Sequence, residues 1–580
     1  MANFFLFFLV LVGLFGSGQQ RFFKTNDVES FPFMVETFFK DYHFMMRWKV
    51  DWEKQMVQFI VHKPAHIAFS SVLVGFSDHG EFKNSDYCLV TGNKVLDGSI
   101  DNDLYLNEDL QQDCINFRKF NEDWFYFERD FVTCDPRDYA IDLGQSQFIV
   151  AFFETEAINM EQAAYKGLLF GKILNDQIPK RVVDSPNEQE IFFGAHDAVI
   201  PKKVTSYRCI VSKIDDSILA TKHHMIEFKA KVTKGNEHLV HHMEVFTCIG
   251  STPDSKLDYE GSCTSRKRPI ESRKCSKVIG AWALGAAPLE YPEEAGAVFG
   301  GPNFPSYIMV EIHYNNEAES QGVRDSSGIV ITYTDKLRQF DAAIMELGLI
   351  YGDANSIPPH QPDFPITGYC APECTSYFPP GGIYLFATQM HAHLTGRKLF
   401  TSHFRDGRKI GEVNRADHYS PHWQLITRLK NTIHVKKGDY LATTCVYDTR
   451  NHTEYVFGGY GIEDEMCVNY VHYYPESEIE VCKSAVSNSS LTGFFEANGI
   501  QESHSLSIHT KYEMLPKSTN TFNDLLELYA VANLNMHCLA HDGKEVSKDV
   551  DWSNLPKPRT NHVGIYSKVV SNYECLRLND

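Results

Sequence analysis

Short runs in which polar and apolar residues alternate, each ended by a turn, recur along most of this chain and limit its fold more than any other feature. Examples are "RWKVDWEKQMVQFIVHK" and "SQFIVAFFE" in the first 155 residues, and "SGIVITYT" and "GIYLFATQMHAHL" further on. A period of two is typical of half-buried β-strands, and the Gly, Pro, Asn and Asp residues between the runs are typical of turns. The chain is therefore predicted to be mainly β and built from antiparallel sandwiches.

A length of 580 residues exceeds what one hydrophobic core supports, so several domains are expected. The run "TNTFNDLLELYAVANLNMH" has helical rather than strand spacing, which predicts a partly helical end of the chain. The expected organisation is a leader at 1–18, a β-sandwich at 30–155, a connector at 156–195, two further sandwiches at 196–345 and 346–490, and a C-terminal tail at 491–580.

The first residues, "MANFFLFFLVLVGLFGSG", contain an apolar run that suits the core of a signal peptide but is short for a membrane span. Cleavage near Gly18 would release the protein into the secretory pathway, into a vesicle lumen or outside the cell. An uncleaved leader would instead hold it at a membrane. The 14 cysteines are scattered rather than grouped in metal-binding pairs, which predicts disulfides in an oxidising compartment. Asn451 and Asn488 begin glycosylation sequons.

The formal net charge of −20 argues against nucleic acid as a partner, because phosphate binding needs a basic surface. A cationic substrate is compatible with this charge, and so is a simple role in solubility.

Histidine pairs are the candidates for metal chemistry. His391 and His393 in "TQMHAHLTG" are two residues apart and would share one face of a strand. The adjacent pair of His241 and His242 would face opposite ways, and could reach one ion only at a strand end or a bulge. His313 in "VEIHYNN" is a further candidate. Imidazoles with a thioether suit copper, although a single pair also arises by chance among 25 histidines.

Longer stretches narrow this choice. "VTKGNEHLVHHMEVF", "MHAHLTGRK" and "GYGIEDEMCVNYVHYYP" resemble the type II copper, ascorbate-dependent monooxygenases, and the match is nearest to their dopamine and tyramine β-hydroxylase branch. The first 150 residues resemble the DOMON domain of that branch. The resemblance implies a DOMON β-sandwich, then two jelly-roll-like catalytic sandwiches and a partly helical tail.

The same resemblance implies two copper ions per chain, with ascorbate as electron donor and dioxygen as co-substrate. An electron-transfer copper would be held by His241, His242 and His313. An oxygen-activating copper would be held by His391, His393 and Met466. The other pair of adjacent histidines, at 223 and 224, binds no metal in the family and is expected to lie in a sheet.

The implied reaction is hydroxylation of the benzylic carbon of a phenylethylamine, either tyramine to octopamine or dopamine to noradrenaline. Tyr470 matches a tyrosine near the reacting centre, and a role in packing is the alternative. Glu346 is the expected partner of the substrate amine, with an ordinary salt bridge as the alternative. Gln389 stands where the peptide-hydroxylating branch has an arginine for a substrate carboxylate, which argues against a peptide. The competing functions are an orphan monooxygenase of the same family with an unknown hydrophobic substrate, and a secreted copper-binding protein without turnover.

The resemblance also implies five disulfides: Cys209–Cys263, Cys248–Cys275, Cys370–Cys482, Cys445–Cys467 and Cys134–Cys538. The remaining cysteines could pair as Cys88 with Cys114 and as Cys374 with Cys575. The cysteines that link subunits in vertebrate relatives are missing, so a homodimer would be noncovalent and formed through the C-terminal helix.

Overall fold

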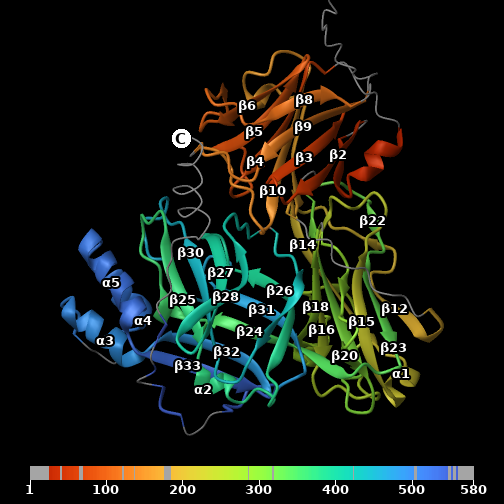
Figure 1. Ribbon diagram of the computed structural model, residues 1–580. Helices are drawn as coiled ribbons and strands as arrows, with labels where there is room; N and C mark the ends of the chain where they lie inside the picture. Colours follow the sequence, from red (N-terminus) through yellow and green to blue (C-terminus); the bar gives the residue numbers. More distant parts are fainter. Residues whose placement is uncertain are drawn as a thin grey trace, which may run out of the picture. The chain divides into compact units, whose positions relative to one another are not determined.

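The structure is a computed structural model, shown in Figure 1. It describes the following residues: 25–39, 42–63, 69–120, 123–135, 137–174, 185–284, 286–316, 319–421, 423–501, 506–546, 550–552, 555 and 557–558. The expected leader at 1–18 and Cys575 lie outside this range. Within it the protein is mainly β, as predicted.

The chain divides into two compact units. The first contains residues 1–75, 86–137 and 149–169, and the second contains 76–85, 138–148 and 170–580. Two short segments of the expected DOMON sandwich, 76–85 and 138–148, therefore belong to the same unit as the two later sandwiches.

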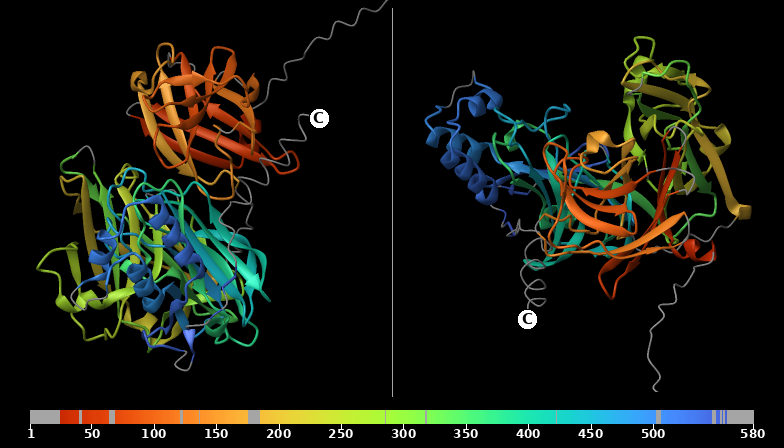
Figure 2. Two further views of the ribbon diagram at one scale, coloured as in Figure 1. Left: turned by 90° about the vertical axis from the view of Figure 1, so that its left-hand side faces the viewer. Right: turned by 90° about the horizontal axis from the view of Figure 1, so that it is seen from above.

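The first unit is built on two antiparallel sheets (Figure 2, red to orange). One has the strand order β1-β2-β3-β9-β8, and the other β11-β10-β4-β5-β6-β7. Their bounds are β1 Phe33–Phe39, β2 Tyr42–Asp51, β3 Met56–His62, β4 Ser71–Ser77, β5 Ser85–Thr91, β6 Lys94–Ile100, β7 Leu106–Glu108, β8 Ile115–Lys119, β9 Trp124–Asp130, β10 Ser146–Phe153 and β11 Tyr165–Gly171. Phe44 of β2 and Phe152 of β10 meet edge to face at 5.8 Å, so the core lies between the sheets.

The second unit begins with a sandwich formed from residues 188–334. One of its layers is the five-stranded sheet β17-β14-β21-β16-β18, and the other is the row β12-β23-β15-β20. The strands are β12 Glu188–Gly194, β13 Ala198–Val199, β14 Thr205–Lys213, β15 Lys222–Lys231, β16 Val240–Cys248, β17 Tyr259–Ser262, β18 Cys275–Ala283, β19 Leu289–Glu290, β20 Ala295–Gly300, β21 Tyr307–Asn315, β22 Arg324–Asp325 and β23 Gly328–Thr334.

A second sandwich follows in the same unit. Its layers are the sheet β25-β30-β27-β28 and a row that contains β24, β31, β26, β29, β32 and β33. The strands are β24 Phe340–Leu349, β25 Phe364–Cys370, β26 Ile383–His391, β27 Gly396–Arg405, β28 Arg408–Ala416, β29 Thr427–Val435, β30 Tyr440–Tyr447, β31 Val468–Tyr474, β32 Ile479–Val486 and β33 Leu534–Ala540.

One sheet continues through both of these sandwiches. β20 pairs with β24 in parallel, which joins the two rows into a single eleven-stranded sheet. The sequence-based boundary at residue 345/346 falls inside β24. The two sandwiches are therefore hydrogen-bonded to each other through their backbones.

The helices are few. They are α1 Asp216–Ala220, α2 Pro372–Thr375, α3 Asn488–Ala497, α4 Ile508–Glu513 and α5 Thr519–Val531, with 3₁₀ turns at Thr25–Ser30, Met160–Gln162, Ser185–Asn187, Ile270–Lys274 and Asp353–Asn355. α5 packs on β25 and on α3, and Phe522, Leu525 and Tyr529 bury its apolar face (Figures 1 and 2, blue). The chain itself covers this face, and the homodimer through α5 remains a prediction. No helix among the described residues is long and apolar enough to cross a membrane.

Four of the five expected disulfides are present: Cys209–Cys263, Cys248–Cys275, Cys370–Cys482 and Cys445–Cys467. The pairings of Cys134 with Cys538 and of Cys374 with Cys575 are wrong, because Cys374 and Cys538 are bonded to each other. The reason is local: β33 places Cys538 opposite Cys482 on β32, in the buried cluster that also holds Cys374. Cys88 and Cys114 are bonded to each other.

Candidate metal centres

Three histidines come together on two neighbouring strands. His241 and His242 lie at the start of β16, and His313 lies on β21 directly opposite His242. The register of the two strands shifts between Val240 and His242. Adjacent histidines can reach one ion only at a strand end or a bulge. This irregularity is such a place, because it lets both side chains turn toward one point.

The three rings form a compact cluster. Nδ1 of His242 lies 3.1 Å from Nδ1 of His241 and 3.3 Å from Nδ1 of His313. Burial, reinforced by the neighbouring histidines, lowers the pKa of His242 to about 3 and that of His313 to about 4. Nε2 of His313 is buried and has no hydrogen-bond partner among the described residues. Neutral imidazoles with an unsatisfied nitrogen are what a copper or zinc ion needs.

The second candidate site lies where β26 ends. His391 is the last residue of β26, His393 follows two residues later, and Met466 precedes β31, the neighbour of β26. The rings of His391 and His393 are 5.1 Å apart and nearly perpendicular. Met466 is almost fully buried.

Hydrogen bonds fix the orientation of both rings in this site. Nδ1 of His391 donates to Oε1 of Gln424, and Nε2 of Gln424 donates in turn to the carbonyl of Pro421 at 2.8 Å. Nδ1 of His393 donates to the carbonyl of Asp464 at 2.8 Å. Both rings therefore keep Nε2 for a ligand, and outer partners of this kind set the tautomer of metal-binding histidines.

Glu465 joins the two parts of this site. Its buried carboxylate accepts from the backbone nitrogen of His393 at 2.9 Å and from that of Met466 at 3.2 Å. It also accepts from the nitrogen and the hydroxyl of Thr395, at 2.6 and 2.7 Å. The loop that carries His393 and the segment before β31 that carries Met466 thus share one acceptor.

A cavity of about 570 Å³, called here the larger cavity, adjoins the second site. His391, Gln389, Tyr470 and Glu346 line it. The last three form a row across three hydrogen-bonded strands, since Tyr470 of β31 lies opposite Glu346 of β24 on one side and opposite Gln389 of β26 on the other. Glu346 and Gln389, expected at the substrate, and Tyr470, expected near the reacting centre, therefore face one space beside His391.

Glu346 has partners in the protein. Nζ of Lys483 forms an ion pair with its carboxylate, and the hydroxyl of Tyr351 donates to it at 3.0 Å. Lys483 is 3% exposed, and burial lowers its pKa to about 8. The salt bridge named as the alternative for Glu346 is thus present, on a residue that also lines the larger cavity.

Glu244 is a second carboxylate on the wall of the larger cavity. It lies on β16, two residues beyond His242 and opposite Glu311 of β21. Burial, together with the charge of Glu311, raises the pKa of Glu244 to about 7. This residue connects the strand of the first site to the space beside the second.

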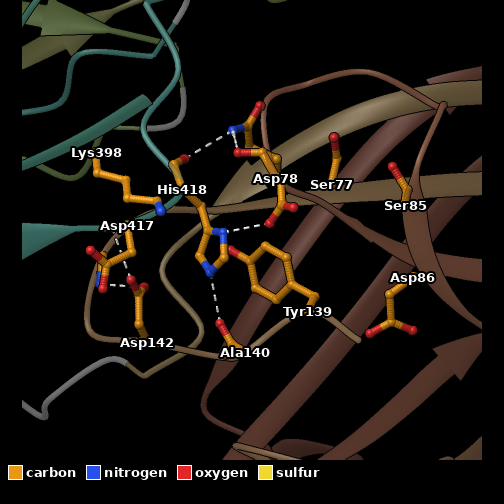
Figure 3. A network of polar contacts seen from close by, with 12 residues as sticks. Ser77, Asp78, Ser85, Asp86, Tyr139, Ala140, Asp142, Lys398, Asp417 and His418 are labelled. Carbon is orange, nitrogen blue, oxygen red and sulfur yellow. Dashed lines mark hydrogen bonds and ion pairs between the residues drawn. The ribbon is translucent and has the colours of Figure 1, made fainter. Parts of the chain in front are cut away.

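The segment that carries Gln424 is anchored by a polar network (Figure 3). His418 points between two acceptors: Nδ1 lies 2.6 Å from the carboxylate of Asp78, and Nε2 donates to the carbonyl of Ala140 at 2.8 Å. The ring of Tyr139 stacks on His418 at 3.9 Å. Asp142 accepts from the backbone nitrogen of Asp417 at 3.1 Å.

This anchored segment reaches the second site at a further point. The hydroxyl of Tyr419, next to His418, accepts from the nitrogen of Ala392 at 2.9 Å and donates to its carbonyl at 2.8 Å. Ala392 stands between the two candidate ligands of its loop. Asp78, Ala140 and Asp142 therefore support the second site through residues 417–421 and 423–424.

Gln424, Glu465, Glu244, Lys483 and Tyr419 were not anticipated from the sequence. Gln424 ends the stretch "HYSPHWQ", and Glu465 lies within the motif "GYGIEDEMCVNYVHYYP", but nothing in those letters shows what the two residues contact. The other adjacent pair, His223 and His224, lies on β15 within the sheet, as expected. His224 on β15 contacts Asp341 at 2.7 Å and accepts from the backbone nitrogen of Arg338 at 3.0 Å.

The chain matches two family models. Residues 193–321 match the N-terminal domain of the copper type II ascorbate-dependent monooxygenases, and residues 340–495 match the C-terminal domain. These matches cover the two sandwiches that carry the candidate metal sites. The chain belongs to the copper type II ascorbate-dependent monooxygenase family.

Individual relatives make this more specific. Tyramine beta-hydroxylase of Caenorhabditis briggsae is 40% identical over 555 residues, which cover 92% of this chain and 93% of that protein. Dopamine beta-hydroxylase of Homo sapiens is 38% identical over 89% of this chain and 85% of its own length. DBH-like monooxygenase protein 1 of Homo sapiens is 30% identical over 72% of this chain and 67% of its length.

Proposed function

We propose that this protein hydroxylates the benzylic carbon of a phenylethylamine, tyramine or dopamine, with two copper ions, ascorbate and dioxygen. The observation that carries the proposal is the larger cavity, in which Glu346, Tyr470 and Gln389 form a row beside His391. The 40% identity to a tyramine beta-hydroxylase along almost the whole chain supports the same reaction.

The candidate ligands suit copper. His241, His242 and His313 would hold one ion, and His391, His393 and Met466 would hold the other. Bound copper supplies one-electron redox chemistry and the activation of dioxygen, and a thioether favours the reduced ion that binds oxygen. Gln424 and the carbonyl of Asp464 keep the two rings of the second site turned with Nε2 available.

The charge of the larger cavity fits a substrate with one positive charge. Glu244 and Glu346 line it, and Lys483 offsets one of these two carboxylates. Glu476 and Glu480, which also line it, are offset by His541 and by Lys277, whose Nζ lies 3.8 Å from Glu480. We assign the ammonium of an amine to Glu244 and Glu346 together. The pKa of Glu244, raised to about 7 by burial and by Glu311, would fall again beside a bound cation, so this carboxyl would ionise as the amine binds.

Tyr470 and Gln389 would place the aromatic end of the amine. Burial raises the pKa of Tyr470 well above its usual range, so the hydroxyl keeps its proton and can donate a hydrogen bond. Gln389 brings an amide in place of a cation, and Nε2 donates to the carbonyl of Gln424 at 2.8 Å. A substrate carboxylate would thus find no charged partner at this position.

We propose that the protein acts in the lumen of the secretory pathway or outside the cell. The disulfides of the structure fit an oxidising compartment. Asn451 and Asn488, which begin the two sequons, are both exposed and therefore open to glycosylation.

The test is oxygen uptake by the copper-loaded protein with ascorbate, in parallel with tyramine and dopamine, with the products identified by mass spectrometry. We expect octopamine or noradrenaline in amounts equal to the oxygen consumed. Met466→Ala should abolish product because it removes a proposed ligand. Met514→Ala, at a methionine that is 54% exposed, is the matched control and should behave as the unaltered protein.

Two copper ions per chain with no uptake on either amine would contradict the proposal and favour a copper-binding protein without turnover. Uptake that appears only with other aromatic compounds would favour the orphan monooxygenase.

A further inference from the structure

His472 is a buried polar residue in the wall of the larger cavity. It lies on β31, two residues beyond Tyr470. Successive side chains of a strand point to opposite faces, so His472 and Tyr470 are on the same side of β31. Both residues line the larger cavity.

Side chains form rows across β26 and β31 on the side of the larger cavity. The alternation of β26 places Gln389 and His391 on this side, and Thr388 and Met390 on the opposite side. Tyr470 belongs to the row of Gln389, and its ring centre lies 6.5 Å from that of His391. The row of Tyr470 is therefore next to the second metal site.

His472 belongs to the next row, further from the second metal site. It lies opposite Ala387 of β26 and opposite Ile344 of β24. Two residues of a strand advance roughly 6.7 Å, which is close to the distance from the benzylic carbon of a phenylethylamine to an oxygen at the far end of its ring. An amine whose benzylic carbon lies beside Tyr470 can therefore extend a ring hydroxyl to His472.

The residues that adjoin His472 are apolar or aromatic. Phe386 meets its ring edge to face, with the ring centres 6.0 Å apart, and Tyr291 packs on Phe386 at 5.3 Å. Ile344 and Tyr291 also line the larger cavity. Burial lowers the pKa of His472 to about 4, so its imidazole is neutral at physiological pH. These surroundings suit the benzene ring of an amine rather than its ammonium.

The imidazole of His472 has an unused nitrogen. Nδ1 is buried and has no hydrogen-bond partner among the described residues. An unpaired buried nitrogen is costly, and a bound molecule or an ordered water would remove that cost. No bond of Nδ1 opposes a turn of the ring about Cβ–Cγ, which exchanges Nδ1 with Cδ2. A hydroxyl both donates and accepts, so it can pair with either tautomer of the neutral ring.

We propose that His472 binds a ring hydroxyl of the substrate and so selects phenolic amines over phenylethylamine, which has none. The inference rests on the proposed function, because it assumes that an amine occupies the larger cavity. Tyramine and dopamine both carry a hydroxyl at the far end of the ring, whereas phenylethylamine would leave the imidazole unpaired. A site built to bond a hydroxyl discriminates strongly against an analogue that lacks it.

The test compares the dissociation constants of tyramine and phenylethylamine. Isothermal titration calorimetry measures them on the copper-loaded protein without ascorbate and without oxygen, so that no turnover occurs. His472→Phe removes both nitrogens and keeps an aromatic ring, and His472→Gln keeps an amide that can bond a hydroxyl. The matched control is His452→Phe, at an exposed histidine that does not line the larger cavity.

We expect the unaltered protein and His452→Phe to bind tyramine at least tenfold more tightly than phenylethylamine. In His472→Phe this ratio should fall to about one, because tyramine binds more weakly while phenylethylamine does not. His472→Gln should restore part of the ratio. A residue that only packs would change the affinity for both amines equally. Thermal melting checks that the variants are folded, and where His472→Phe is not, His472→Leu takes its place with the same expected ratio.

Equal affinities for the two amines in the unaltered protein, or an unchanged ratio in His472→Phe, would overturn the inference. Hydroxylation of tyramine in that case would still support the proposed function. The expected ratios in a protein that hydroxylates neither amine would support the role of His472 and contradict the proposed function. Failure of the unaltered protein to bind either amine would contradict both.

Discussion

Gln424 Oε1 accepts a hydrogen bond from Nδ1 of His391 across 33 residues of sequence. This bond lies outside the proposed ligand set, yet it decides which nitrogen of His391 is left for a metal ion. The amide is itself held by Pro421, so its oxygen cannot turn away without losing a second bond.

Gln424→Leu is expected to weaken copper binding at the second site by about 10- to 100-fold, because the ring of His391 loses the partner that fixes its tautomer. Competition with a chelator, followed site by site, measures this. Gln189→Leu is the control, since the amide of Gln189 accepts from Tyr333 in the other sandwich at 2.9 Å. Equal copper affinity in both variants would show that Gln424 does not position His391.

Glu465→Ala is expected to lower the free energy of unfolding by about 3 kcal/mol or more, because buried donors of His393, Thr395 and Met466 lose their acceptor. Glu465→Gln keeps one acceptor oxygen and should cost less. Urea denaturation measures both values. Glu463→Ala, at an exposed position two residues away, should change stability little, and a cost as large as that of Glu465→Ala would contradict the assignment.

His418 predicts a dependence of stability on pH. Bonds to Asp78 and Ala140, with the charge of Asp142 nearby, outweigh burial and raise the pKa of His418 to about 9. The charged ring stabilises the fold fully below the ordinary pKa of histidine, and this contribution is lost as pH rises through about 9. Urea midpoints measured from pH 6 to 10 should fall along this range in the unaltered protein, by more than they fall in His418→Gln. Urea midpoints that fall equally with pH in the two proteins would show that His418 is not charged in the folded state.

Lys483 and Glu346 are expected to be coupled. Lys483→Met leaves a carboxylate in the wall of the larger cavity without its cation, and should cost about 3 kcal/mol of stability. The double variant Lys483→Met/Glu346→Gln should cost less than the sum of the single changes. The same cycle on Lys544 and Asp542, an exposed pair, should give a coupling energy near zero. Additive costs for Lys483 and Glu346 would mean that the pair contributes nothing.

The β architecture could be predicted because it depends on a local property. Alternation along β16 or β26 reports which side chains face the core, and the turns between the runs mark where strands end. The bulge near His241 could be stated as a condition but not located, since a shift of register depends on the partner strand β21.

Contacts between distant segments could not be predicted in the same way. Cys538 bonds Cys374 rather than Cys134 because β33 joins β32, and no pattern in the sequence gives that pairing. Gln424 and Glu465 are polar residues in irregular segments, which are usually solvated. Their roles depend on the pairing of β26 with β31, which places the ends of both strands at one point.

The alternation of β26 makes this strand a partition with two independent sides. Residues 389 and 391 line the larger cavity, and residues 388 and 390 line a second cavity of about 240 Å³ on the other side of the strand. A substitution at residue 389 or 391 should therefore alter the larger cavity, whereas one at residue 388 or 390 should leave its lining unchanged. Substrate preference can then change through the first pair of residues while the packing behind the strand stays constant.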